Sequence, residues 1–318
     1  MTNNLSKINL IYIASTGRSG STLLESILGT HSQIINVGEI QVWPRNLVEG
    51  GFLPCGCGVN VPDCPFWNQV AEKVNPLTQT SPQIDFFREK YNAGKTLRMS
   101  RVKDFFKKVE PSKSLKEKID IYGDNNYKIF EALLEVAEKE TKIRPQWIVD
   151  SSKDPYRLLW LISSQRFNIK VIQITKDPRA FVYSMSKEII KEKPSNLHQK
   201  LLKMTVMKSG AWLIQNQLFA QLGKLYLSPL DYKLIQYEQL ASEPEKVIPE
   251  IADFVGFSFE EKAITEFRNN KNHTIAGNPM RFREGGISLD EAWKVRLPNI
   301  YQNLAKLITQ VKMSDYGY

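Results

Sequence analysis

A strand, a turn of small residues and a helix follow one another near the start of the chain, and this order constrains the fold more than any other feature. The apolar run at 10–14 predicts a buried parallel strand, and the apolar residues among 23–28 predict one face of a helix. Between them, residues 15–22 read Ser-Thr-Gly-Arg-Ser-Gly-Ser-Thr. A helix that starts at such a turn directs free backbone N–H groups and its positive end at an anion. The segment therefore predicts a phosphate-binding loop.

Most residues of this turn have a use in holding an anion. Gly17 and Gly20 allow the backbone to curl closely around a phosphate. Arg18 supplies a fixed charge that binds phosphate or sulfate in bidentate fashion. Hydroxyl donors come from Ser19, Ser21 and Thr22.

One residue is missing from the turn. The P-loop of nucleotide triphosphatases reads G-x-x-x-x-G-K-[ST], with its lysine on the terminal phosphates. Here Ser21 follows Gly20, and only Arg18 and Ser19 separate the two glycines. The pattern disfavours a P-loop kinase or NTPase. That class remains the alternative, because residues 147–150 (Trp-Ile-Val-Asp) look like the strand that carries a magnesium-binding aspartate in such enzymes.

The string at 16–24 (Thr-Gly-Arg-Ser-Gly-Ser-Thr-Leu-Leu) resembles the 5′-phosphosulfate loop of sulfotransferases that use 3′-phosphoadenosine 5′-phosphosulfate (PAPS). The resemblance implies an α/β, P-loop-like three-layer fold with a central parallel sheet flanked by helices. It also implies that the chain transfers a sulfuryl group, requires no metal, and holds the 5′-phosphosulfate with residues 17–22. Apolar runs near 10, 147, 171 and 234 alternate with helical patterns, as a parallel sheet requires.

A second segment resembles the family's 3′-phosphate site. A strand at 171–175 leads into Asp177-Pro178 and a helix, with proline near the first helical position. The family has a basic residue at the strand end and a serine eight positions later, which implies roles for Lys176 and Ser184. Lys176 stands where the family usually has arginine, and Arg179 is expected to share its role.

A third segment, 281–286 with Trp293-Lys294 after it, is similar in a looser way to the loop that closes over the nucleotide in this family. The resemblance implies that Arg283 and Gly285 bind the 3′-phosphate, with Arg281 as a substitute. Two further segments, 237–240 and 253–257, resemble family segments that we interpret as structural.

Sulfuryl transfer requires an acceptor atom in line with the sulfur, a base for its proton and cations for the developing charge. Glu39 resembles the catalytic glutamate of the tyrosylprotein branch, which implies that it is the base. Lys153 resembles the lysine of the family's Ser-Lys segment, which implies that it and Arg18 stabilise the transferring group. We interpret His31 as a cap or core residue. For Arg157 the sequence leaves two alternatives, an acceptor contact or a solvent-exposed side chain.

We expect a single sulfotransferase domain over 1–318, with a helical basic insertion at about 80–140. The chain carries a net charge of +9, and residues 85–118 alone hold 11 Lys or Arg against 5 Asp or Glu. This stretch is either a pair of solvated helices or a lid over the acceptor that attracts anions. Since no nucleic-acid-binding motif accompanies the charge, we expect no nucleic-acid partner.

The chain has three cysteines, Cys55, Cys57 and Cys64, in a loop rich in turn residues. With no histidine nearby in the sequence, they are one ligand short of a structural zinc site, so we expect no metal. A disulfide from Cys55 or Cys57 to Cys64 is left open.

The acceptor is the least constrained part of the prediction. We expect a small molecule with a hydroxyl or amine group: a secondary metabolite such as a guanidinium alkaloid, a sugar or a lipid. The N-terminus lacks a basic-then-apolar signal, and no apolar run approaches the length of a membrane span. We therefore expect a cytoplasmic protein without a membrane partner. The sequence does not indicate an oligomeric state.

Overall fold

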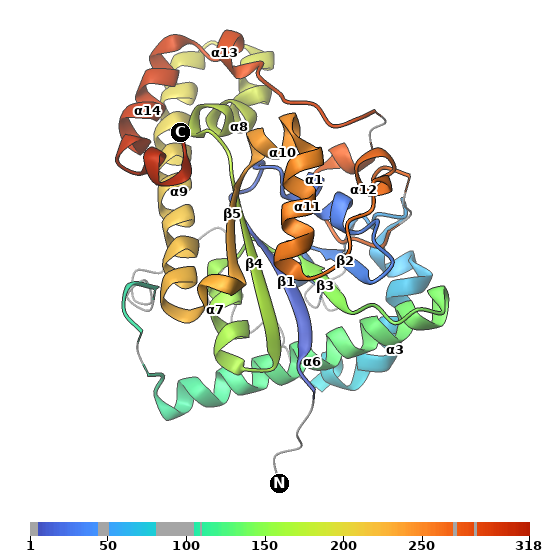
Figure 1. Cartoon of the computed structure of the whole chain (residues 1–318). Helices are drawn as coiled ribbons and strands as arrows, with labels where there is room; N and C mark the ends of the chain where they lie inside the picture. Colours follow the sequence, from blue (N-terminus) through green and yellow to red (C-terminus); the bar gives the residue numbers. More distant parts are fainter. Residues whose placement is uncertain (1–5, 44–50, 81–104, 109, 270–271, 283–284) are drawn as a thin grey trace.

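The computed structural model describes residues 6–43, 51–80, 105–108, 110–269, 272–282 and 285–318. Within them, five parallel strands form a sheet in the order β2-β3-β1-β4-β5. The strands are β1 (Ile8–Ala14), β2 (Ile34–Gly38), β3 (Trp147–Asp150), β4 (Phe167–Thr175) and β5 (Tyr232–Gln236). The α/β fold with a parallel sheet between helices is confirmed (Figure 1).

The helices are α1 (Ser21–Leu28), α3 (Pro65–Thr80), α6 (Lys113–Thr141), α7 (Pro155–Ser164), α8 (Pro178–Glu192), α9 (Leu197–Tyr226), α10 (Tyr237–Ser242), α11 (Pro244–Val255), α12 (Lys262–Thr265), α13 (Trp293–Arg296) and α14 (Asn299–Met313). Short 3-10 helices are η1 (Ile40–Val42), η2 (Val61–Asp63), η5 (Pro229–Asp231), η6 (Pro279–Phe282) and η7 (Ser314–Tyr316).

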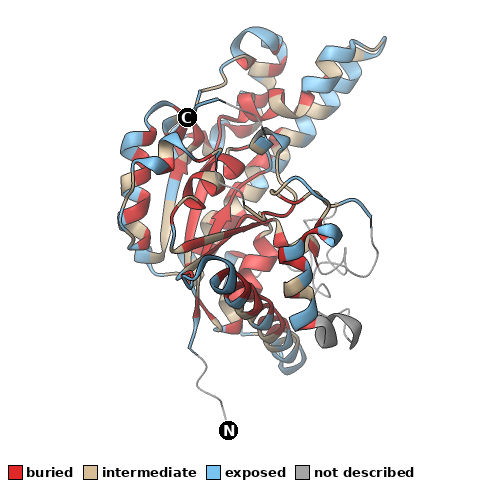
Figure 2. Ribbon diagram, turned by 90° about the vertical axis from the view of Figure 1, so that its right-hand side faces the viewer, coloured by how far each residue is buried: buried red, intermediate tan, exposed pale blue. Residues whose placement is uncertain are grey.

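The two faces of the sheet bury different side chains of the same strand. On β1, Leu10 and Tyr12 pack with residues of α3, α6, α7 and α9, whereas Ile11 and Ile13 pack with residues of α1, α10 and α11. This alternation follows from the two-residue period of a strand. A strand covered on both faces has to be apolar throughout, which is why β1 reads as a continuous apolar run. Figure 2 shows the resulting band of buried residues between the exposed outer surfaces of the helices.

Four of the strands lie where the apolar runs predicted them, but β2 is missing from the prediction. It is short and contains Asn36 and Gly38, residues that disfavour strands, and its register with β3 shifts between them. Asn36 is used within the structure, because its side-chain amide donates to the carbonyl of Glu25. Pairing with β3, rather than local propensity, therefore makes this segment a strand.

Part of the predicted basic insertion belongs to the core. Helix α6 buries Ile129, Phe130 and Leu133 in the same cluster as the inner faces of α3 and α7. Residues 81–104 lie outside the described residues, so the choice between solvated helices and an acceptor lid stays a prediction. None of the helices in the described part of the chain has the length and apolar character that crossing a membrane requires.

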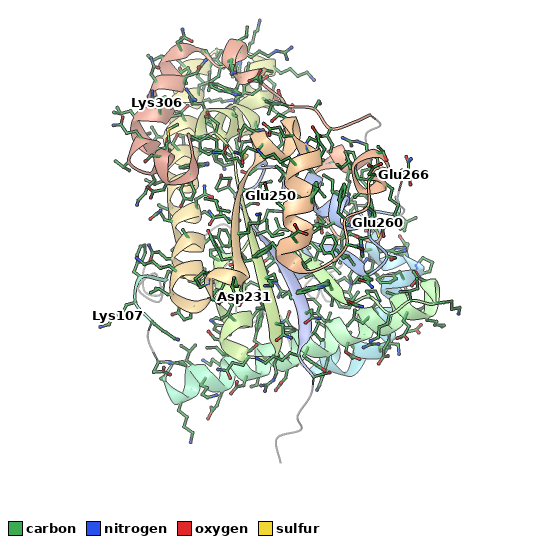
Figure 3. The ribbon with its side chains drawn as sticks, in the orientation of Figure 1. Lys107, Asp231, Glu250, Glu260, Glu266 and Lys306 are labelled. Carbon is green, nitrogen blue, oxygen red and sulfur yellow. The ribbon has the colours of Figure 1, made fainter. Side chains whose placement is uncertain are left out.

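Several charged side chains pair on the outer surface of the molecule. Asp231 pairs with Lys170 at 3.0 Å, and Glu250 pairs with Lys233 at 3.3 Å, around the start of β5. Figure 3 labels Asp231, directly before β5, and Glu250, on α11. Exposed pairs of this kind contribute little to stability.

Arg157 fits neither of the two alternatives left open by the sequence. Arg157 is only 3% exposed, and its Nε donates to Asp150 Oδ2 at 2.9 Å. Its Nη1 donates to Tyr122 and to Asn126 of α6, at 2.6 and 2.7 Å. Arg157 thus joins the end of β3 to α6 inside the protein, and its guanidinium is occupied by protein groups.

We predict that Arg157→Ala lowers the free energy of unfolding by about 3–5 kcal/mol, because the Asp150 carboxylate would remain buried without its counter-charge. Urea unfolding followed by circular dichroism measures the loss. Arg144→Ala is the matched control: Arg144 also contacts two acidic groups, Glu131 and Glu138, but its side chain is 40% exposed. We expect the control to lose less than about 1 kcal/mol. Equal losses in the two variants would contradict this interpretation.

Candidate active site

The predicted site residues follow the carboxyl ends of four neighbouring strands. The loop at 15–20 follows β1, Glu39 follows β2, Lys153 lies shortly after β3, and Lys176 follows β4. From β1 the chain runs to β2 at one edge of the sheet, whereas from β4 it runs to β5 at the opposite edge. In open parallel sheets a ligand binds outside the carboxyl ends of the strands at such a reversal.

The predicted phosphate loop ends in a helix whose first turn has no side-chain cap. Gly20 is the N-cap of α1, with φ of 92°, and as a glycine it provides no side-chain cap for the first-turn N–H groups. Ser19 is buried, and its hydroxyl shares a 2.6 Å hydrogen bond with that of Thr16. Gly17 and Arg18 are exposed at the tip of the loop. Backbone donors and the helix dipole are therefore available to an anion at this end of α1.

Residues Ser21 and Thr22 form the first turn of α1 and are mostly buried. The Thr22 hydroxyl oxygen accepts a hydrogen bond of 3.3 Å from the backbone N–H of Asn278. A segment from late in the chain thus lies against the start of α1.

Tyr237 connects the phosphate loop with the second predicted site. A Cβ atom on Gly20 would lie 2.5 Å from Tyr237 Cδ2, so only glycine fits there. On the same ring, Lys176 Nζ lies 4.2 Å from the centroid, a cation–π contact. The sequence placed Tyr237 in a structural segment, and the structure shows that this residue brings Gly20 and Lys176 together.

The predicted 3′-phosphate residues come from the end of β4 and from α8. Lys176 is buried, and burial lowers the pKa of its ammonium group. Arg179 donates from Nη2 to Asp177 Oδ2 at 2.6 Å, and its guanidinium lies 4.5 Å from the Trp293 ring centroid. Ser184 is half-buried further along α8. Trp293, taken from the third sequence segment, therefore packs over Arg179 as part of this region.

The rest of the third segment is less informative. Arg283 lies outside the described residues, and Gly285 is exposed with φ of 105°. Arg281, the predicted substitute, binds protein carbonyls instead: its Nη1 donates to Thr274 O at 3.2 Å and its Nη2 to Pro54 O at 3.0 Å. Arg281 thus fastens two loops to each other.

The two residues predicted to perform the chemistry contact each other. Lys153 Nζ donates to Glu39 Oε1 at 2.8 Å, and the side chains are 12% and 26% exposed. Gln215 of α9 holds this region to the phosphate loop, because its Nε2 donates to Lys153 O at 2.8 Å and to Ser15 O at 3.1 Å. A carboxylate and an ammonium group are therefore paired at the edge of the sheet, close to the loop after β1.

Glu25 is a site residue that the sequence reasoning missed. Its Oε1 accepts from Gly38 N at 2.6 Å and its Oε2 from the Ser151 hydroxyl at 2.9 Å. Burial raises the pKa of its carboxyl from 4.5 to about 7, while Lys153 opposes the shift. A carboxylate among the apolar residues of α1 was the available signal. Glu25 joins α1 to the ends of β2 and β3, which carry Glu39 and Lys153.

The sulfotransferase domain family matches residues 9–282, a range that includes the phosphate loop, Glu39, Lys153 and the end of β4. The chain belongs to this family. The resemblance drawn from the phosphate loop is therefore confirmed.

Two curated relatives of this sulfotransferase are called carbohydrate sulfotransferase 1. The zebrafish (Danio rerio) protein is 24% identical over 173 residues, and the mouse (Mus musculus) protein is 26% identical over 175 residues. Each match covers 50% of this chain but only 40% or 41% of the relative. The chain thus matches less than half the length of these relatives.

Solved sulfotransferase structures share the fold. A sulfotransferase domain from the curacin biosynthetic pathway is 18% identical, with 95% of this chain and 98% of that chain covered and a TM-score of 0.52. Mouse sulfotransferase SULT7A1, complexed with PAP, is 11% identical, with 97% and 85% covered and a TM-score of 0.51. At these identities the likeness concerns the fold alone.

We predict that Glu25→Gln makes the stability of this protein less dependent on pH. Between pH 4.5 and about 7 the folded wild type keeps the Glu25 proton and the unfolded chain loses it, so the wild type loses stability as pH rises. The glutamine amide oxygen can accept from Gly38 N, its Nε2 can donate to the Ser151 hydroxyl oxygen, and the side chain does not titrate. Urea unfolding should give similar stabilities at pH 5, and a variant more stable than wild type by roughly 3 kcal/mol at pH 8. The same difference at both pH values would contradict the buried carboxyl.

Proposed function

We propose that this chain transfers a sulfuryl group from PAPS to a hydroxyl or amine of a small-molecule acceptor by in-line transfer. The observation that carries the proposal is the Lys153–Glu39 pair, 2.8 Å apart, beside a helix start that lacks a side-chain cap. An anion-binding loop, a cation and a carboxylate are the three groups that sulfuryl transfer requires. Membership of the sulfotransferase family supports the same assignment.

The residues of the site fit the two anionic ends of PAPS. We assign the 5′-phosphosulfate to Gly17, Arg18, Ser19, Gly20, Ser21 and Thr22, and the 3′-phosphate to Lys176, Arg179, Ser184, Arg283 and Gly285. Among the described residues, no carboxylate lies within ion-pair distance of Lys176, whose buried ammonium faces the ring of Tyr237. Glu238, Asp290 and Asp177 interact with it only at longer range, and a buried cation without a direct ion pair favours an anionic ligand. Arg179 already pairs with Asp177, so we give Lys176 the larger share of the 3′-phosphate.

The roles of the catalytic residues follow from their contact. Bound PAPS supplies the activated sulfuryl group. Glu39 takes the proton from the acceptor hydroxyl or amine, and the hydrogen bond from Lys153 orients its carboxylate for that step. Lys153 and Arg18 stabilise the negative charge that develops on the leaving phosphate.

The structure also bears on the alternative, a P-loop kinase or NTPase. Such an enzyme needs a carboxylate after the central strand to help hold magnesium. Asp150 occupies that position, but its Oδ2 accepts from Arg157 and its Oδ1 accepts from the backbone N–H of Ser152 at 2.8 Å. Both oxygens are thus engaged with protein groups, which disfavours the alternative. A P-loop kinase or NTPase would bind ATP, and the binding would require magnesium.

The acceptor stays a proposal of chemical class. The relatives named above are a carbohydrate sulfotransferase and a sulfotransferase domain of a biosynthetic pathway, which favours a sugar or a secondary metabolite. A guanidinium alkaloid or a lipid remains in the same class of small acceptors. Cytoplasmic location and independence of metal for the reaction stay predictions.

We predict that 3′-phosphoadenosine 5′-phosphate (PAP) stabilises the protein against heat without magnesium. At about 100 times its dissociation constant, PAP should add about 2.7 kcal/mol, whereas AMP, which lacks the 3′-phosphate, should add much less. Differential scanning fluorimetry measures the shift. Lys176→Met should reduce the PAP shift, while Lys170→Met, within β4 and paired with Asp231, should leave it unchanged. A shift that appears only with ATP and magnesium would overturn the proposed function.

We predict that Glu39→Gln lowers the rate of sulfuryl transfer by about 10²–10⁴-fold, because the acceptor proton then has no base. Lys153→Met should lower it by about 10²–10³-fold. Transfer of radioactive sulfate from PAPS to a panel of sugars, phenols and guanidines measures the rate. PAP binding of Glu39→Gln should match wild type, and Glu260→Gln, a substitution beside α12, should keep full activity. A Glu39→Gln variant with the wild-type rate would remove Glu39 from the mechanism.

A further inference from the structure

Three cysteines and one histidine meet at a single point beside the sheet. The ligand atoms of Cys55, Cys57, Cys64 and His273 all lie within 4.8 Å of one another. Cys64 Sγ is 3.7 Å from each of the other two sulfur atoms. His273 Nδ1 lies 3.2 Å from Cys64 Sγ and 3.7 Å from Cys55 Sγ. None of these residues takes part in the chemistry proposed above.

The histidine is the ligand that the sequence lacked. The loop was one ligand short of a zinc site because no histidine stands near it in the chain. His273 is 209 residues beyond Cys64, and the fold brings it against the loop. No histidine is near the cysteines in the sequence, but His273 contacts two of them in the folded protein.

The spacing of the four atoms matches a tetrahedral metal site. With Zn–S bonds of about 2.3 Å and a Zn–N bond of about 2.0–2.1 Å, tetrahedral geometry separates two sulfur atoms by about 3.8 Å and a sulfur from the nitrogen by about 3.6 Å. Four of the six separations, 3.2 to 3.7 Å, lie close to these values, and all six are within 4.8 Å. We propose that Cys55, Cys57, Cys64 and His273 form a structural zinc site.

A disulfide explains the cluster less well. All three cysteines are free, and sulfur atoms 3.7 Å apart are well beyond the bond length of about 2.05 Å. A disulfide would also use two cysteines and leave the third without a role. Four ligands with soft sulfur and imidazole donors, and no further carboxylate in the set, are typical of a closed structural zinc site.

The surroundings hold the histidine ring in place for this role. Its Nδ1 faces the sulfur atoms, while its Nε2 faces Glu140 Oε2 at 4.0 Å. A carboxylate on the far side of a ligating imidazole is a common partner in zinc sites. The Phe66 ring stacks on the imidazole with centroids 4.6 Å apart, and Trp67 Nε1 donates to the backbone carbonyl of His273 at 2.8 Å.

The backbone of the cysteine loop is shaped for close contact with the histidine segment. Gly56, between two of the cysteines, donates its N–H to Thr274 O at 2.8 Å. A Cβ atom at Gly56 would lie 2.0 Å from Asn272 Oδ1 and 2.7 Å from Thr274 Oγ1, so only glycine fits. The two segments are thus already in register, and a metal ion would fix them together.

This site would act on the catalytic region through Ile275, two residues after His273. Ile275 O accepts from Glu39 N at 2.9 Å, and Ile275 N donates to Val37 O at 3.0 Å. The zinc site thereby anchors the segment that holds the end of β2. Its role is structural, because the ligand set is complete without water or substrate.

We expect the full-length protein, purified without chelator, to contain about one zinc ion per chain by plasma mass spectrometry. Cys64→Ser and His273→Gln should reduce the zinc content at least tenfold. His198→Gln is the matched control, since His198 bonds to Tyr301 of α14 and is not part of the cluster, and it should retain the metal. Chelation of the wild type should lower its melting temperature, and added zinc should restore it.

Because the ligand variants can fail to fold, the wild type provides a second test. Replacement of the metal by Co²⁺ should give the intense visible bands of a tetrahedral site with thiolate ligands. Wild-type protein that has three reduced thiols, no zinc and no Co²⁺ spectrum would overturn the proposal, as would a disulfide between any two of the cysteines. None of these measurements depends on sulfotransferase activity. The zinc proposal can therefore be overturned without affecting the proposed function, and the proposed function can be overturned without affecting the zinc proposal.

Discussion

The buried carboxyl of Glu25 is the contact on which the geometry of the site depends. Parallel strands bring their carboxyl ends to one edge, but nothing in the ladder fixes how the loops beyond them are placed. Glu25 fixes the placement of these loops by accepting hydrogen bonds from Gly38 N and from the Ser151 hydroxyl. These two bonds connect α1 with the ends of β2 and β3. The two hydrogen bonds offset part of the cost of burying the Glu25 carboxylate. The raised pKa shows that some of this desolvation cost remains.

Buried polar groups recur throughout this edge of the sheet. Arg157 pairs with Asp150 of β3 and also donates to α6, and Gln215 connects the loop after β1 with Lys153. Each of these groups would destabilise the fold if it lost its partner, so they require one arrangement of the strand ends. Rigid strand ends suit a reaction in which the acceptor, sulfur and leaving oxygen have to be in line.

The sequence predicted the parts of the fold that local patterns determine. The turns after β1 and β4 carry their own signals in glycines, hydroxyls and the Asp-Pro start of α8, and the helices α1 and α8 follow these turns as expected. Strand β2, the Arg157 pair and the role of His273 escaped prediction because each depends on a partner far along the chain. Such partners can be identified only after the topology is known. Arg281, which the sequence offered as a phosphate ligand, instead joins two loops by donating to their carbonyl groups.

The end of β2 is held from two sides, and this explains why a short, irregular strand can carry the proposed base. Glu25 binds Gly38 N on one side, while Ile275 pairs with Val37 and Glu39 on the other. A Cβ at Gly38 would lie 2.2 Å from Ile275 O, so the two backbones can approach this closely only at glycine. The cysteine–histidine cluster fixes the segment that contains Ile275. The position of the base thus depends on a carboxyl in α1 and, through Ile275, on the proposed metal site.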